Sequence, residues 1–443
     1  MLIRDVEIEG RGRVDVRVEE GRIAAIGRRL AGHAQVEGGG AALLPGLHDH
    51  HIHLMALAAE SASVRVGPAE VRGRDELAKI LRDGAPGEWV RAVGYHESVA
   101  GELDRWTLDV LVPDRPVRVQ HRSGAMWILN SAALRTAGLE STDGRLWRED
   151  GRLRTLLAPV PLDLTGLGRR AAALGVTGLT NADPHPADGL AQTLSVLPQR
   201  LVVMGVDPPV KLILDDPTLP TPADLAATVV GVRPRPVAVH CATRVQLLVT
   251  LLALEEAGPV EGDRIEHGSV IPAEALPRLR RLGVTVVTQP HFPAERAEAY
   301  ATEVHPDDRP HLYRCRSLTE AGVPVAAGTD APYGTHDPWS VMRAAVARDV
   351  RERLTPRAAL GLFLGSPHRP ERPRRVAVGS PADLCLLHVP LQEALDALTA
   401  DTVRAAYVHG RLITEPAPDH EERRERAARP GLPQALRGHR PMA

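Results

Sequence analysis

Lysine is almost missing from this chain of 443 residues: only Lys79 and Lys211 occur among 54 basic residues. Cysteine is also scarce, and Cys241, Cys315 and Cys385 lie far apart, which argues against a disulfide framework and favours a reducing, cytoplasmic compartment. Aromatic residues make up 3% and the formal net charge is -2, so neither a stacking platform nor a basic surface for nucleic acid is visible. No apolar run approaches the ~18 residues of a membrane span, and the first residues do not resemble a leader peptide.

The order of short and long apolar patterns predicts the domain organisation. Alternating strands with glycine turns occupy residues 1–44 and return over 376–415, so we expect the two ends to form one small β-sandwich domain. Over 45–375, short apolar runs alternate with stretches at helical spacing, which predicts a parallel sheet with crossover helices, a (β/α)8 TIM-like barrel. Surplus strand-like runs place an inserted segment at about 85–160. The charged, proline-rich end, 416–443, is expected to be a flexible tail.

Five separated strand-like runs each carry, at or near their end, a side chain that can bind a metal ion. The runs are LLPGLHDHHIHL with His51 and His53, PPVKLILDD with Lys211, PVAVHC with His240, DRIEH with His267, and VPVAAGTD with Asp330. The strands of a barrel end on one face, so we expect these side chains to meet there. His51 and His53 lie two apart on a strand, so they point the same way and can share one ion.

Lys211 strengthens the case for a metal centre, because almost every other basic residue is arginine. Arginine keeps its proton in proteins, whereas a buried lysine can lose it and react with carbon dioxide to give a carbamate that bridges two metal ions. Imidazole and carboxylate ligands suit zinc, with iron, manganese or cobalt as alternatives. The pattern predicts metal-assisted hydrolysis, in which a metal activates water and Asp330 serves as ligand and general base.

Each of these residues, taken alone, also has an ordinary structural interpretation. The histidine pair can belong to a histidine-rich loop with His48 and His50, and single histidines can be hydrogen-bonded core residues. A lone lysine can be a surface group, and Asp330 in Gly-Thr-Asp can cap a helix or form a turn. The order along the chain, with each residue at a strand end, favours the metal centre.

The segments around these residues resemble the amidohydrolase superfamily, in particular the YtcJ-like branch of amidohydrolase family 3 that includes N-substituted formamide deformylases. The likeness rests on LLPGLHDHHIHL, RIEHGSVI, GTDAP and GSPADLCLLHVP, and on VQHRSGAMWILNSAALRTAGL, which is similar to the substrate-side segment of that branch. It implies two zinc ions per chain, bridged by a carboxylated Lys211. The other implied ligands are His51 and His53 for one ion, His240 and His267 for the second, and Asp330 as ligand and base.

The substrate side departs from that branch. Ala125 stands where the branch usually has a histidine after Ser-Gly, and HCATRVQ replaces the usual glycine and aspartate after His240. The reaction class therefore transfers better than the substrate, and we expect cleavage of a C–N amide-type bond in a small N-acyl or N-formyl amine. The residues expected to contact it are His121, Arg122, Trp127, Asn130, Gln289, His291 and Tyr333. The likeness also allows a homodimer.

Two other functions fit the sequence. A one-metal aminohydrolase would release ammonia from a heterocycle, with Lys211 only structural, and it would need a further acid. The candidates for that acid are Glu255, Glu256 and Glu266. The loss of histidine at Ala125 also fits a non-catalytic barrel that binds a ligand or partner, although retention of every candidate metal ligand argues against it.

Overall fold

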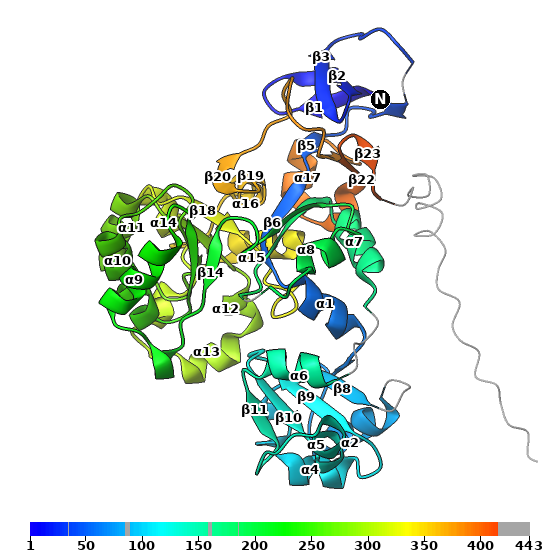
Figure 1. Ribbon diagram of the computed structural model, residues 1–443. Coiled ribbons are helices and arrows are strands. Elements are labelled where there is room, and N and C mark those ends of the chain that lie inside the picture. The colour runs from blue at the N-terminus through cyan, green and yellow to red at the C-terminus, as the bar shows by residue number, and fades with distance from the viewer. Residues whose placement is uncertain (34, 85–88, 158–161, 185, 415–443) are drawn as a thin grey trace, which may run out of the picture.

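The computed structural model describes residues 1–414 apart from 34, 85–88, 158–161 and 185. Figure 1 shows three parts: sheets from the two chain ends at the top, parallel strands with their helices in the middle, and an inserted sheet at the bottom. The expected tail, 416–443, lies outside the described residues.

Eight parallel strands form the middle part, in a three-stranded sheet ordered β13-β12-β6 and a five-stranded sheet ordered β14-β15-β16-β17-β18. Their bounds are β6 Leu47–Ile52, β12 Val176–Asn181, β13 Arg200–Val203, β14 Val210–Leu212, β15 Val237–Cys241, β16 Arg264–His267, β17 Thr285–Thr288 and β18 Val325–Ala327. The first and last strands meet at or just beyond their carboxyl ends, where Asp330 N donates to His51 O at 2.8 Å and His53 N to Ala331 O at 2.9 Å. These strands therefore bring their carboxyl ends to one face.

Helices accompany these strands, as crossover connections predict. They are α1 Leu54–Ser61, α7 Leu164–Ala173, α8 Leu190–Leu194, α9 Pro222–Val232, α10 Arg244–Ala257, α11 Leu276–Leu282, α12 Phe292–Glu295, α13 Ala297–Glu303, α14 Arg316–Glu320, α15 Pro338–Ala347 and α16 Pro356–Gly361. One connection departs from the regular pattern: residues 204–209, all described, join β13 to β14 without a helix. The segment is short, and Pro208 and Pro209 lack the backbone N–H that a helix needs. Among the described residues, no helix combines the length and apolar character of a membrane span.

The inserted segment is a five-stranded sheet ordered β11-β10-β9-β8-β7 with five helices. Its elements are β7 Val64–Arg65, α2 Arg74–Asp83, β8 Val90–Tyr95, α3 Glu97–Ala100, α4 Arg105–Leu111, β9 Val117–His121, β10 Met126–Leu129, α5 Ser131–Ala137, β11 Arg145–Trp147 and α6 Asp150–Leu156. The sheet begins at Val64, before the expected start near residue 85, because a strand followed by a helix has the same sequence pattern as a barrel repeat. The strands β8 and β9 are parallel, and Tyr95 pairs with His121 at their carboxyl ends.

The two chain ends share one hydrophobic core. One sheet holds β1 Leu2–Ile8, β2 Gly12–Glu19, β3 Arg22–Gly27 and β4 Val36–Glu37; the other holds β5 Leu43–Pro45, β21 Leu384–Leu387, β22 Val403–Val408 and β23 Arg411–Leu412, with α17 Leu391–Ala397 after β21. Ile3, Val16 and Leu43 pack in one buried cluster with Leu384 and Leu386. A hairpin of β19 Gly365–Ser366 and β20 Arg369–Pro373 completes the strands. Because β5 is followed directly by β6, this core anchors the first strand of the middle part.

Candidate metal centre

The histidines and the aspartate named from the sequence come together at the carboxyl ends of the parallel strands. The ring centroids of His51 and His267 are 4.7 Å apart, and those of His240 and His267 are 4.5 Å apart. Ligand atoms of His51, His53 and Asp330 all lie within 4.8 Å of one another. Residues from β6, β15, β16 and the end of β18, far apart in sequence, therefore form one cluster.

Lys211, on β14, belongs to the same cluster. Burial, with a smaller contribution from the charge of Lys211, lowers the pKa of His51 well below its ordinary value and that of His240 to about 3. Burial lowers the pKa of Lys211 itself, which favours the neutral amine that a carbamate requires.

A buried ion pair orients His51. Its Nδ1 contacts Glu266 on β16, and the carboxylate of Glu266 also accepts hydrogen bonds from Nε and Nη2 of Arg264, the latter at 3.1 Å. Glu266 is fully buried and Arg264 is 2% exposed. Burial alone would raise the pKa of Glu266, but Arg264 and Lys211 lower it, so the carboxylate stays charged. Holding Nδ1 of His51 in this way leaves Nε2 directed at the cluster.

His53 is oriented in the same manner by Asp183, just beyond β12. The distance from His53 Nδ1 to Asp183 Oδ1 is 2.9 Å, and His53 Nε2 lies 3.2 Å from Asp330 Oδ1. Burial lowers the pKa of His53, but the nearby carboxylates of Asp183 and Asp330 outweigh it and raise the pKa to about 9. A metal ion at Nε2 would have to displace a proton from this ring.

Two of the clustered residues have left-handed backbones that only glycine adopts easily. The φ angles are 66° at His267 and 54° at Asp330. Such conformations cost roughly 1–3 kcal/mol each and are enriched at active sites and ligand clamps. Gln289 Oε1 lies 3.0 Å from His267 Nδ1 and fixes that ring as well.

The donor atoms of the cluster fit a divalent metal ion. His51 Nε2, Lys211 Nζ and Asp330 Oδ1 are buried, and none has a hydrogen-bond partner in the described part of the chain. Buried polar atoms are nearly always hydrogen-bonded, so three such atoms from three strands at one place require another partner. Nitrogen and carboxylate oxygen are the donors that zinc and its neighbours in the first transition row accept.

The inserted sheet reaches the cluster through Tyr333. A Cβ built on Gly124, whose φ is +72°, would lie 2.5 Å from the Tyr333 ring, so only glycine fits there without a shift. The ring of Tyr333 in turn packs edge-on against His53, with centroids 5.3 Å apart. The turn between β9 and β10 therefore lies one side chain away from a candidate ligand.

The other predicted substrate contacts lie at different depths. Gln289 is at the centre, and His291 is buried beside Phe292 with its pKa lowered to about 3 by burial. His121 and Arg122 lie on the insert, where Arg122 Nη2 is 3.2 Å from Glu303 Oε1. The structure brings none of these insert side chains into direct contact with the clustered ligands in any described interaction.

Two of the predicted substrate contacts are buried inside the insert and have partners there. Trp127 is 4% exposed and packs in the core of the insert, with the Arg118 guanidinium 5.4 Å from its ring. Asn130 caps α5: its Oδ1 accepts from Val117 N and Ala133 N, and its Nδ2 donates to backbone carbonyl groups. Both side chains are used within the insert. The sequence did not predict that Glu266, Asp183 and Gln289 orient the candidate ligands, although all three lie at or just beyond a strand end.

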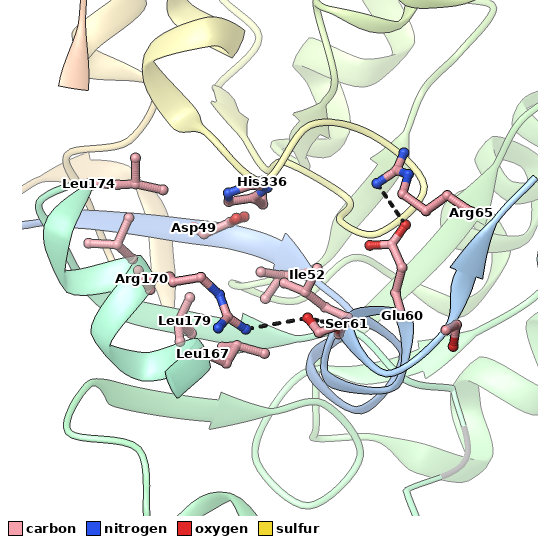
Figure 2. A pocket seen from close by; sticks show the side chains of 14 residues that line it. Asp49, Ile52, Glu60, Ser61, Arg65, Leu167, Arg170, Leu174, Leu179 and His336 are labelled. Carbon is pink, nitrogen blue, oxygen red and sulfur yellow. Dashed lines mark hydrogen bonds and ion pairs between the residues drawn. The ribbon is translucent and has the colours of Figure 1, made fainter. Parts of the chain in front are cut away.

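A separate cavity of about 280 Å³ lies beside β6 and β12, against α1 and α7 (Figure 2). Ile52 and Leu179 supply apolar surface, and Arg170 Nη2 lies 3.3 Å from Ser61 Oγ. Asp49 borders the cavity, but its carboxylate accepts hydrogen bonds from the backbone of His51 and Thr329. The residues lining it include none of the six candidate ligands, so this cavity is distinct from the metal centre.

The comparison with protein families shows which family the chain belongs to. A family model described as "Amidohydrolase family" matches residues 37–189 and 225–414. The chain belongs to the amidohydrolase family. As an amidohydrolase it is a metal-dependent hydrolase that acts on C–N bonds of small molecules, and the resemblance seen in the sequence is confirmed.

Relatives support this assignment. The amidohydrolase is 24% identical over 532 aligned residues to N-substituted formamide deformylase from Arthrobacter pascens, covering 93% of this chain and 97% of that protein. It is 30% identical to the putative amidohydrolase YtcJ from Bacillus subtilis (strain 168) over 25% of this chain and 22% of the relative. An uncharacterized metal-dependent hydrolase from Pyrococcus horikoshii OT3 superposes with a TM-score of 0.69 at 19% identity, covering 87% of this chain and 97% of the other. The expected TIM-barrel-type α/β fold is thereby confirmed.

Proposed function

We propose that this amidohydrolase cleaves the C–N amide bond of an N-formyl or N-acyl amine with the help of two divalent ions, zinc being the first candidate. The proposed ligands are His51, His53, His240, His267, Asp330 and a carboxylated Lys211. The observation that carries the proposal is a set of three buried atoms that can bind a metal ion, His51 Nε2, Lys211 Nζ and Asp330 Oδ1, none of which makes a hydrogen bond in the described part of the chain. In this proposal β18 and β6 close the eight strands into a barrel, and the terminal sheets form a sandwich beside it.

The ligand side chains have distinct roles in this reaction. When bound, the ions would lower the pKa of water and polarise the scissile carbonyl group. Asp330 Oδ1 lies 3.2 Å from His53 Nε2 and 3.5 Å from His51 Nε2, so its carboxylate can take the proton of the attacking water and pass it to the leaving nitrogen. Glu266 and Asp183 keep the two imidazoles turned toward this point.

Of the three carboxylates considered for ammonia release, two have other partners and the third, Glu256, is exposed on α10, which supports amide hydrolysis. Glu266 is held by Arg264 and His51. Glu255 lies on the exposed side of α10 and pairs with Arg278 and Arg281. The similarity to an N-substituted formamide deformylase makes N-formyl amines the first substrates to try.

The proposal is tested with a panel of N-formyl amines, N-acyl amines and amino-heterocycles, incubated with the zinc-loaded protein while free amine, carboxylate and ammonia are measured. We expect amine and carboxylate from the acyl compounds. Asp330→Asn should lower kcat by roughly 10²–10⁴-fold, whereas Asp307→Asn, at an exposed aspartate, should leave it unchanged. Ammonia from a heterocycle without acyl cleavage, or full activity of the Asp330 variant, would contradict the proposal.

A further inference from the structure

Two histidines of the inserted sheet repeat one local arrangement. His96 and His121 lie at the carboxyl ends of the parallel strands β8 and β9, and each begins a His-x-Ser turn. In both turns Nδ1 of the imidazole lies 2.8 Å from the Oγ and 3.2 Å from the backbone nitrogen of the serine two residues later, Ser98 or Ser123. The serine of each turn therefore contacts Nδ1 of the ring, and Nε2 contacts side chains of other residues.

Both Nε2 atoms meet carboxylates. His121 Nε2 is 3.2 Å from Glu97 Oε2, and His96 Nε2 is 3.6 Å from the same oxygen. His96 Nε2 is also 3.5 Å from Oε1 of Glu303, the last residue of α13. A tetrahedral zinc ion with bonds of about 2.0–2.2 Å holds its ligand atoms about 3.3–3.6 Å apart. These spacings therefore match the edges of a zinc coordination sphere.

We infer that His96, Glu97 and His121 form a second divalent-metal site, separate from the centre at the strand ends, for zinc or a similar transition-metal ion. Their ligand atoms lie within 4.8 Å of one another. Oε1 of Glu303, on α13, lies 3.5 Å from His96 Nε2 and 3.2 Å from Arg122 Nη2, so Glu303 is the candidate for a fourth ligand. The imidazoles are 16–18% exposed and Glu97 is 42% exposed, so an ion can enter from solvent.

Ser98 and Ser123 would orient the imidazoles of the proposed ligands through Nδ1. A neutral imidazole cannot donate from Nδ1 to the serine Oγ and accept there from the amide at the same time. Metal binding at Nε2 selects the first arrangement, in which Nδ1–H donates to Oγ and the Nε2 lone pair is free for the ion. Because Glu303 belongs to α13 and the histidines to the insert, the ion would tie the inserted sheet to the part of the chain that carries the other metal centre.

The test compares zinc bound per chain in the full-length wild type and in the double variant His96→Asn/His121→Asn. An asparagine side chain can keep the contact made by Nδ1 in each turn but places no donor where Nε2 lies. His305→Asn is the matched control, because His305 Nδ1 also accepts from a backbone amide two residues later, that of Asp307, at 3.3 Å. Each protein is stripped with a chelator, dialysed, titrated with zinc and analysed by elemental mass spectrometry.

We expect the double variant to bind one zinc ion fewer than the wild type, and His305→Asn to bind as many as the wild type. Equal binding by the double variant and the wild type would overturn the inference. Because the result is a difference between variants, it does not depend on how many ions the centre with Lys211 holds. If circular dichroism shows that the double variant is unfolded, His121→Asn and Glu97→Gln are measured singly; retention of the extra ion by both would also overturn the inference.

Discussion

Glu266 is expected to stabilise the metal centre although it is not a candidate ligand. Its buried carboxylate balances the charge of Arg264, which is 2% exposed, and contacts Nδ1 of His51. In Glu266→Gln the guanidinium would keep its charge without a counter-ion, and removing one partner of a buried ion pair costs about 3–5 kcal/mol. Loss of an outer partner typically lowers metal affinity roughly 10–100-fold. We therefore expect a free energy of unfolding lower by about 3 kcal/mol and zinc affinity lower by at least roughly tenfold.

Two measurements check this prediction. Urea denaturation of the metal-free protein gives the change in the free energy of unfolding, and competition with a chromophoric chelator gives the zinc affinity. Glu255→Gln is the matched control: Glu255 pairs with Arg278 and Arg281 at the surface, where an ion pair contributes about 1 kcal/mol or less. The reasoning is refuted if Glu266→Gln binds zinc as tightly as the wild type, or if both variants lose the same stability.

Two further predictions concern the approach to the centre and its protons. Gly124→Ala should lower activity by displacing Tyr333, whereas Gly138→Ala, at a left-handed glycine (φ 64°) with no atom within 4 Å, should cost only backbone strain of about 1 kcal/mol; equal activity of both variants would contradict this. The pKa of His53 is raised to about 9, so at neutral pH both nitrogens of the metal-free ring hold a proton, and zinc must displace the proton on Nε2. The heat of zinc binding, measured by calorimetry in two buffers of different ionisation enthalpy, should therefore differ between the buffers at neutral pH, and this difference should disappear well above pH 9. A heat of binding that is the same in both buffers at neutral pH would refute the prediction.

The reasoning from strand ends located residues that the fold brings together. Parallel strands must end on one face, so a metal-competent residue at each end was enough to predict the cluster of His51, His267 and Asp330. Their roles as ligands remain predictions. The left-handed backbones of His267 and Asp330 were not predictable, because only the complete fold imposes them.

Partners across the fold were harder to predict than the clustered residues themselves. Glu266 was a candidate acid from its place in the sequence, but its two partners come from its own strand and from β6, and the pairing depends on how these strands pack. Asn130 stands in a segment typical of the substrate side, but asparagine caps helices equally well, and here it caps α5. The start of the insert was misplaced because β7 and α2 have the pattern of a barrel repeat.

The central claim is a two-ion centre bridged by carboxylated Lys211, and one measurement tests it most directly. Metal per chain is determined by elemental mass spectrometry for the wild type, Lys211→Arg and Lys79→Arg, all purified without chelator and with bicarbonate. Lys79 is the other lysine of the chain and is exposed on α2, so its replacement controls for loss of a lysine as such. The account predicts that Lys211→Arg loses at least one ion and its activity, because arginine cannot form the carbamate, and that Lys79→Arg keeps both. A Lys211→Arg variant with the metal content and activity of the wild type would contradict it.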